Sequence, residues 1–224
     1  LDEFHLYDIY VPIVGEYDKK YEYEEAKNII IKVLEVFGDE YVNKVKEGLD
    51  SRWIDVYPTK NKRTGGYSGG MYDTDPYILL NYQDKYNDMS TLIHEMGHSM
   101  HSYYSRSYNE FQNSEYRIFV AEVASTVNEL LLSHYMLENS GSKEEKLFIL
   151  NNLMELYKAT IYRQTMFAEF ERDISKIIDN DGALTSEKLS NMYYDLNKFY
   201  FGDNVYVDDE IRYEWERIPH FYYD

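Results

Sequence analysis

The stretch "DMSTLIHEMGHSMHSYY" at residues 88–104 constrains the fold more than any other part of the sequence. Residues four apart lie on one face of an α-helix, so in a helix His94 and His98 can both point a ring nitrogen at one metal ion. Glu95 lies about 100° further round the helix and can reach a water molecule at that ion without ligating it. Because zinc lowers the pKa of such a water to about 7, the glutamate could then take its proton. The spacing therefore predicts a hydrolytic zinc site on a helix.

The residues around this motif favour a packed helix over the alternative of a solvated helix with scattered histidines. Gly97 is unfavourable inside a helix unless another group packs or binds close to it. Four residues give the helix an apolar side: Leu92, Ile93, Met96 and Met100. We therefore expect a helix over about residues 86–105 with one packed side.

His101 is not expected to share this ion. It follows His98 on nearly the same face, but helical rise places it about 10 Å from His94. Two interpretations stay open for His101. It either supports the site or lines its groove, or it is an ordinary packed histidine.

A third ligand is expected from the next helix, which contains the apolar run "IFVAEVAS". Glu122 sits within this run, where a carboxylate is unfavourable to bury unless it is paired or bound to metal. Glu129 follows two turns later on nearly the same face, and we expect it to orient one of the histidine rings. The alternative for either residue is an ordinary surface glutamate.

Composition limits which side chains could hold a metal and which classes of partner are expected. The 224 residues include no cysteine, so any metal must be held by histidine and carboxylate, a donor set that suits zinc. The formal net charge of -18 would repel phosphate backbones and anionic membranes, which argues against nucleic acid and membranes as partners. No apolar run approaches the roughly 20 residues of a membrane span and no signal peptide is visible, so we expect a cytoplasmic protein. The start at Leu1 indicates a piece of a longer protein.

Hydrophobic spacing along the rest of the chain indicates a mainly α protein with a short sheet before the motif helix. The segments "WIDVYP" and "DPYILLNYQ" favour strands, and "TKNKRTGGYSGG" between them is expected to be a flexible loop. With no repeat, low-complexity tract or clear linker, residues 1–224 are taken as one domain. Further helices are expected over about residues 21–37, 41–49, 116–139, 143–178 and 186–201.

Taken together, these segments resemble the oligoendopeptidase F family within the thimet-oligopeptidase-like zinc peptidases. The resemblance runs over nearly the whole chain, through "HLYDIYVPI", "DPYILLNY", "LIHEMGHSMHSYY", "FVAEVASTVNE", "YRQTMFAEFE" and "RIPHFYYD". It implies a mainly α, zincin-like metallopeptidase catalytic domain in a protein of two lobes around a deep channel. It also implies one zinc ion per chain on His94, His98 and Glu122. Glu95 corresponds to the family's catalytic base.

The resemblance adds residues that spacing alone does not indicate. The family uses a histidine and tyrosines of a C-terminal segment to stabilise the oxyanion and hold the substrate backbone. Here this implies His220 and Tyr223 as catalytic groups and Tyr222 as a substrate contact, although without the resemblance a frayed, tyrosine-rich terminus would be preferred. The glycine-rich loop with Gly66 and Tyr67 borders the cleft in the family, where a strand edge can bind peptide by main-chain pairing.

The proteins of this family are longer, with a helical region before the part present here and a continuation after "HFYYD". The chain is therefore expected to be a catalytic core, and the missing N-terminal lobe is an expected partner. The predicted function is zinc-dependent hydrolysis of peptide bonds in short unfolded peptides. The alternatives are an inactive metal- or peptide-binding fragment that needs the missing lobe for turnover, and a plain helical interaction module.

Overall fold

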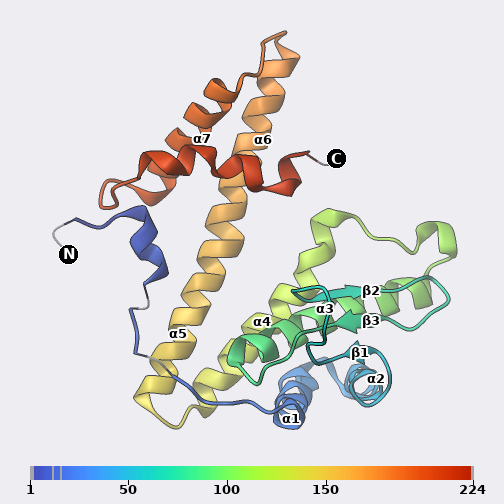
Figure 1. The fold of residues 1–224 in the computed structure, drawn as a ribbon. Helices are drawn as coiled ribbons and strands as arrows, with labels where there is room; N and C mark the ends of the chain where they lie inside the picture. Colours follow the sequence, from blue (N-terminus) through green and yellow to red (C-terminus); the bar gives the residue numbers. More distant parts are fainter. Residues whose placement is uncertain (1–2, 12, 16, 223–224) are drawn as a thin grey trace. The chain divides into compact units, whose positions relative to one another are not determined.

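The chain divides into two units (Figure 1). In this computed structural model the described residues are 3–11, 13–15 and 17–222. The motif unit is Tyr17–Leu150, and the terminal unit is Leu1–Glu16 together with Asn151–Asp224. That residues 1–224 form one catalytic domain stays a prediction. None of the helices formed by the described residues is long and apolar enough to cross a membrane.

The motif unit is mainly helical, as the hydrophobic spacing predicts, and its sheet precedes the motif helix in the chain. Its helices are α1 (Tyr23–Leu34), α2 (Asp39–Asp50), α3 (Tyr86–Tyr108), α4 (Ile118–Asn139) and the first part of α5 (Lys143–Tyr157). The helices α1, α3 and α4 pack around one core. Ile30 of α1, Met89 of α3 and Leu132 of α4 are all fully buried there.

The sheet has three short strands in the order β1-β3-β2. The strand β1 (Ile54–Asp55) runs parallel to β3 (Tyr77–Leu79), and β2 (Tyr67–Gly69) runs antiparallel to β3. Both β1 and β3 lie in the segments that the sequence favours as strands. The prediction of a flexible loop is wrong for β2, which lies in the glycine-rich segment. Its main chain pairs with β3 and packs on α3, and this tertiary pairing overrides the weak strand propensity of glycine.

The helix α3 is the predicted motif helix, and its apolar side is buried against the core. Gly97 faces α4, where an added Cβ atom would come within 2.7 Å of the Cα atom of Ser125. Glycine lets the two helix backbones approach this closely, which explains a residue that is otherwise unfavourable within a helix. The almost fully buried Asn128 of α4 donates from Nδ2 to the main-chain oxygen of Ile93 at 3.1 Å and joins the same two helices.

The terminal unit has a smaller core of its own. Helical structure runs without a break from α5 through a π-helical turn (Lys158–Tyr162) into α6 (Arg163–Asp179), so the helix predicted over about 143–178 is confirmed. The helix α7 (Ser186–Phe201) packs against α6 and against a 3₁₀ helix at Asp209–Arg217. Two shorter 3₁₀ helices are Leu6–Tyr10 and Pro219–Tyr222. The buried core residues are Met166, Phe170, Tyr193 and Ile218.

Candidate metal centre

The motif unit brings together three donor groups from two helices. His94 and His98 project from α3, and Glu122 projects from the first turns of α4. Glu122 Oε2 lies 3.4 Å from His94 Nε2 and 3.3 Å from His98 Nε2. Ligand atoms of all three residues lie within 4.8 Å of one another. The structure thus assembles the three residues that the sequence analysis names as ligands.

This donor set fits a zinc ion. Two imidazole nitrogens and one carboxylate oxygen are a recurrent set for catalytic zinc, in which a fourth position stays open. Zinc bonds of about 2.0–2.1 Å at tetrahedral angles would place neighbouring ligand atoms about 3.4 Å apart. The two separations from Glu122 Oε2 match this value.

Each histidine ring has a further hydrogen-bond partner on α4. His94 Nδ1 lies 2.9 Å from Glu129 Oε2, and Ser90 Oγ donates to the other oxygen of Glu129 at 3.3 Å. The ring of His98 hydrogen-bonds to the main chain of Ala121. Such contacts fix the tautomer and the orientation of a ligating imidazole. Glu129 therefore stands where a carboxylate that orients His94 is expected.

Glu122 differs from the expectation in one respect, because it is not buried. Its side chain is 62% exposed, and the nearby Ile118 and Phe119 are 87% and 91% exposed. Most apolar side chains at the start of α4 are therefore exposed, although Ala121 and Ser125, on the side facing α3, are buried. Ser125 Oγ donates to Glu122 Oε2 at 2.7 Å. No sequence pattern singles out Ser125, although its position three residues after Glu122 places both on one helix face.

Glu95 lies between the donor cluster and the sheet. The residue is 7% exposed, and the main chain of Ser68 in β2 hydrogen-bonds to its carboxylate. Burial raises the pKa of Glu95, the charge of His94 opposes this shift, and the carboxylate of Glu122 adds to it. A raised pKa suits a group that takes and returns a proton near neutral pH.

The two residues expected to border the cleft lie beside Glu95 and in β2. A Cβ atom on Gly66 would come within 2.8 Å of Thr91 Cγ2 and 3.5 Å of Glu95 Oε1. A glycine at this position therefore leaves room for the Glu95 carboxylate. Tyr67 begins β2, pairs with Leu79 and is 47% exposed. Contact of Gly66 and Tyr67 with substrate stays a prediction.

The two histidines of the cluster differ in their electrostatics. Burial lowers the pKa of His98, which favours the neutral ring that binds metals. Burial acts in the same direction on His94, but the hydrogen bond and charge of Glu129 outweigh it and raise the pKa of His94. An ionised carboxylate only accepts hydrogen bonds, so the contact with Glu129 requires a proton on His94 Nδ1. In the neutral ring the free lone pair is then on Nε2, the nitrogen that faces Glu122.

His101 is not part of the donor cluster. Its ring stacks on Tyr116, with 3.8 Å between the ring centroids and 10° between the planes. Its Nδ1 atom is buried without a hydrogen-bond partner among the described residues, and burial lowers the pKa of His101. The stacking supports the interpretation as a packed histidine, and a supporting role beside the metal stays a prediction.

The C-terminal residues implied by the family resemblance belong to the terminal unit. His220 is exposed within the 3₁₀ helix Pro219–Tyr222. Tyr222 is 58% exposed and donates its hydroxyl to the main-chain oxygen of Glu216 at 3.2 Å. Tyr223 lies outside the described residues. The catalytic and substrate-binding roles of these three residues therefore stay predictions.

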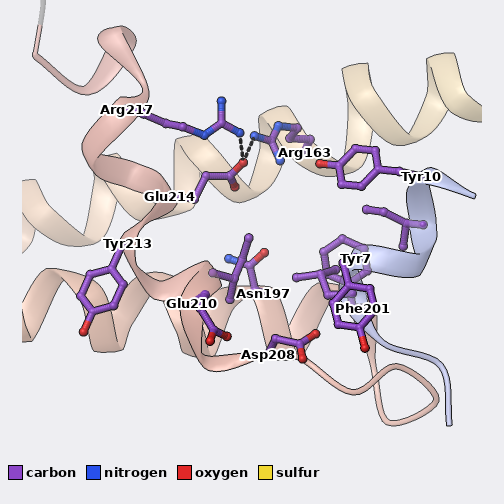
Figure 2. A pocket seen from close by; sticks show the side chains of 13 residues that line it. Tyr7, Tyr10, Arg163, Asn197, Phe201, Asp208, Glu210, Tyr213, Glu214 and Arg217 are labelled. Atoms are coloured by element: carbon purple, nitrogen blue, oxygen red, sulfur yellow. Dashed lines mark hydrogen bonds and ion pairs between the residues drawn. The ribbon is translucent and has the colours of Figure 1, made fainter.

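The terminal unit contains a cavity of about 630 Å³. Figure 2 shows Arg163 and Arg217 converging on Glu214 at one side of it, with Asp208 at the other. Arg163 Nη2 donates to Glu214 Oε1 at 2.8 Å, and the Tyr193 hydroxyl donates to Glu214 Oε2 at 2.6 Å. Both oxygens of this carboxylate are thus paired within the protein.

Comparison with known proteins connects this fold and cluster to a family. All of residues 1–224 match Peptidase family M3. Oligopeptidase PepF of Bacillus subtilis is 52% identical over 224 residues, which make up 100% of this chain and 33% of that protein. The chromosomal oligoendopeptidase F of Lactococcus lactis subsp. cremoris is 43% identical over 224 residues, or 100% of this chain and 37% of that protein.

A solved structure agrees with these sequence matches. The crystal structure of oligoendopeptidase-F from Enterococcus faecium has a TM-score of 0.64 and 34% sequence identity to the chain, and the match covers 100% of this chain and 32% of that one. The predicted fold class, a mainly helical peptidase domain with a small sheet before the motif helix, is confirmed. The chain spans about a third of the length of these relatives. Since the family match extends over both units, the chain belongs to peptidase family M3.

Proposed function

We propose that this chain carries the catalytic centre of a zinc-dependent endopeptidase that hydrolyses peptide bonds in short oligopeptides. The observation that carries the proposal is the position of Glu122 Oε2, which lies 3.4 Å and 3.3 Å from the Nε2 atoms of His94 and His98. The buried Glu95 adjoins this cluster. The relatives support the substrate class, because they are named as an oligopeptidase and an oligoendopeptidase.

His94, His98 and Glu122 would hold one zinc ion. Bound zinc supplies Lewis-acid chemistry, which polarises the peptide carbonyl and lowers the pKa of a water molecule to about 7. Glu95 accepts the proton of the attacking water and returns it to the nitrogen of the leaving amine. Between the two transfers Glu95 holds this proton.

Other residues are proposed to bind the substrate and its developing charge. His220 and Tyr223 would donate hydrogen bonds to the carbonyl oxygen as it becomes negative, and Tyr222 would contact the substrate backbone. Tyr67 begins β2, an edge strand of the sheet, and Gly66 directly precedes it. Main-chain groups of such a strand can pair with an extended, unfolded peptide. The missing lobe as a partner and a cytoplasmic location stay predictions.

The test of the mechanism is Glu95→Gln in the complete protein. Glutamine keeps the size of the side chain but cannot act as a base, so kcat/KM toward a quenched fluorescent peptide is expected to fall about 10²- to 10⁴-fold. One zinc per chain should be retained. The control is Glu47→Gln, an exposed glutamate of α2 that pairs with Lys44, and it should change neither quantity. Near-full activity of zinc-loaded Glu95→Gln would contradict the proposal.

The length of the chain favours a second candidate function. Because it spans about a third of its relatives, the chain alone is a candidate for a metal- or peptide-binding fragment without turnover. Zinc content and peptide hydrolysis are measured for residues 1–224 and for the complete protein. Zinc uptake by both, with turnover in the complete protein only, supports this fragment function. An absence of stoichiometric zinc from both contradicts the zinc site.

A further inference from the structure

We propose that Ser125 is a positioning residue of the metal centre and holds the Glu122 carboxylate in the orientation that ligates the ion. This inference rests on the proposed function, since it concerns the same site. Ser125 would touch neither the ion nor the substrate. Zinc affinity should therefore depend on a hydroxyl group that is not itself a ligand.

The geometry around Glu122 carries this proposal. Ser125 Oγ lies 2.7 Å from Glu122 Oε2, the same oxygen that lies 3.4 Å and 3.3 Å from the two histidine nitrogens. Ser125 is 0% exposed, whereas the side chain of Glu122 is 62% exposed. An exposed glutamate samples several rotamers and loses conformational entropy when it is fixed. A buried donor restricts the carboxylate before the metal arrives.

The hydroxyl of Ser125 has two acceptors within reach. Its single hydrogen can go to Glu122 Oε2 at 2.7 Å or to the main-chain oxygen of Glu122 at 3.0 Å. Serine within a helix often donates to a main-chain oxygen of the preceding turn. The carboxylate is the closer acceptor and is charged, and charge-assisted hydrogen bonds are about twice as strong as neutral ones. The carboxylate is therefore the favoured acceptor.

Ser125 is also held from its other side. A Cβ atom on Gly97 would lie 2.7 Å from the Cα atom of Ser125 and 2.9 Å from its main-chain nitrogen. The backbone of Ser125 thus rests directly on α3, the helix that carries both histidines. Helix packing, rather than a flexible side chain, sets the distance between the hydroxyl and the histidine rings.

With Ser125 included, α4 supplies one supporting contact for each ligand. Glu129 and the main chain of Ala121 contact the two histidines, and Ser125 contacts Glu122. The supporting contacts of a metal site orient its ligands, and losing one typically weakens metal affinity about 10- to 100-fold. Ser125 completes this arrangement for the ligand that is most exposed.

The experiment compares Ser125→Ala with Thr126→Val in the complete protein. Ser125→Ala removes the hydroxyl with little change in volume, and the zinc dissociation constant, measured by competition with a chelator, is expected to rise about 10- to 100-fold. Thr126 is the matched control because its Oγ1 donates to the main-chain oxygen of Glu122 at 2.6 Å. Thr126→Val should keep the zinc affinity of the wild type.

Two further measurements separate positioning from folding. The melting temperature of the metal-free protein should be the same for Ser125→Ala and Thr126→Val. Excess zinc should restore the peptidase activity of Ser125→Ala, which it would not do for a misfolded site. Ser125→Thr keeps the hydroxyl, so its zinc affinity should stay close to that of the wild type.

The outcomes distinguish this inference from the proposed function. An unchanged zinc affinity of Ser125→Ala, in a protein whose wild type binds zinc, overturns the inference alone. Equal weakening by Thr126→Val also overturns it, because the main-chain hydrogen bond would then be responsible. If Ser125→Ala does not fold, the zinc affinity of Ser125→Gly, which also removes the hydroxyl, decides in the same way. A wild type that binds no zinc overturns the proposed function. Ser125 would then have no metal ligand to position, so the inference would fall with it.

Discussion

Glu122 of the motif unit and Glu214 of the terminal unit are two carboxylates in opposite settings. The side chain of Glu122 is 62% exposed and faces two imidazole rings and a serine hydroxyl. The side chain of Glu214 is 7% exposed. It faces the guanidinium groups of Arg163 and Arg217 and the hydroxyl of Tyr193. Burial alone would select Glu214 as the functional acid.

The difference between the two clusters lies in their donors. A guanidinium is permanently charged, so the cluster around Glu214 carries its own positive charge at any ordinary pH. An imidazole changes between neutral and protonated forms near neutral pH, and its neutral nitrogen is a metal ligand. The carboxylate of Glu122 therefore faces a positive charge only when a histidine is protonated or a metal ion is bound. The partners of a carboxylate, more than its burial, separate a candidate site from a stabilising ion pair here.

Gly97→Ala is expected to have the largest effect, because it breaks the packing on which the Glu122 cluster depends. The added Cβ atom would meet backbone atoms of α4 at 2.7 and 2.9 Å, so the helices must move apart. We expect the free energy of unfolding to fall by about 3 kcal/mol, despite a gain of about 1 kcal/mol in helix propensity. Zinc should be lost on dialysis, as measured by elemental analysis.

The control for this substitution is Gly141→Ala, where the nearest atom to an added Cβ lies 4.0 Å away. It should leave zinc content and stability close to those of the wild type. Full zinc content in Gly97→Ala would show that the cluster does not depend on the close approach of α3 and α4.

Glu214→Gln is the corresponding change in the terminal unit and should have an intermediate effect. It removes the charged acceptor of Arg163 and Tyr193, and we expect the free energy of unfolding to fall by about 2 kcal/mol in urea titrations. Arg217 adds little to this value because its side chain is 70% exposed. Zinc affinity should not change. The exposed Glu216 provides the control Glu216→Gln, which should leave stability unchanged.

The pH dependence of this variant sharpens the comparison. Burial tends to raise the pKa of Glu214, but hydrogen bonds from Arg163 and Tyr193 outweigh it and lower the pKa. Such a carboxylate contributes stability above its unfolded pKa of about 4.3 and loses that contribution as the pH falls through its folded pKa. The stability difference between wild type and Glu214→Gln should therefore shrink below about pH 4. A difference that stays constant there would argue against a charge-based contribution.

Glu129→Gln should have the smallest effect of the three. Glutamine can still accept a hydrogen bond from His94 Nδ1 but carries no charge, so zinc affinity should fall about 10-fold with little change in stability. The exposed Glu138 on the same helix pairs with His134 at 3.2 Å, and Glu138→Gln is the control. A loss of stability at unchanged zinc affinity would place Glu129 with Glu214, as part of an ion pair that stabilises the fold.

The parts of the site that the sequence predicts are those fixed by spacing along one helix. The cluster of His94 and His98 with the adjoining Glu95 follows from the period of α3 alone. Glu122 is found because it interrupts an apolar run, and Glu129 because it follows two turns later on nearly the same face of α4. The expected burial of Glu122 is wrong, since Ile118, Phe119 and Val123 around it are exposed as well. An apolar run indicates a buried face only where another element covers it.

The parts that the sequence does not predict depend on contacts between distant segments. Ser125 looks like any serine within a helix until the Glu122 carboxylate and Gly97 are placed around it. The strand β2 lies in a segment rich in glycine, and its pairing with β3 makes it a strand. Local propensity carries no information about either contact.

The exposed first turns of α4 have a thermodynamic consequence. Ile118 and Phe119 are 87% and 91% exposed, whereas Ala121 and Ser125 on the opposite side of the same turns are buried, so these turns are packed on one side only. Zinc bound to Glu122 would tie these turns to α3 at one further point. A molecule or chain segment that orders these turns would strengthen zinc binding by the same free energy with which zinc orders them. Metal occupancy and the folding of one helix end then act as effectors of each other.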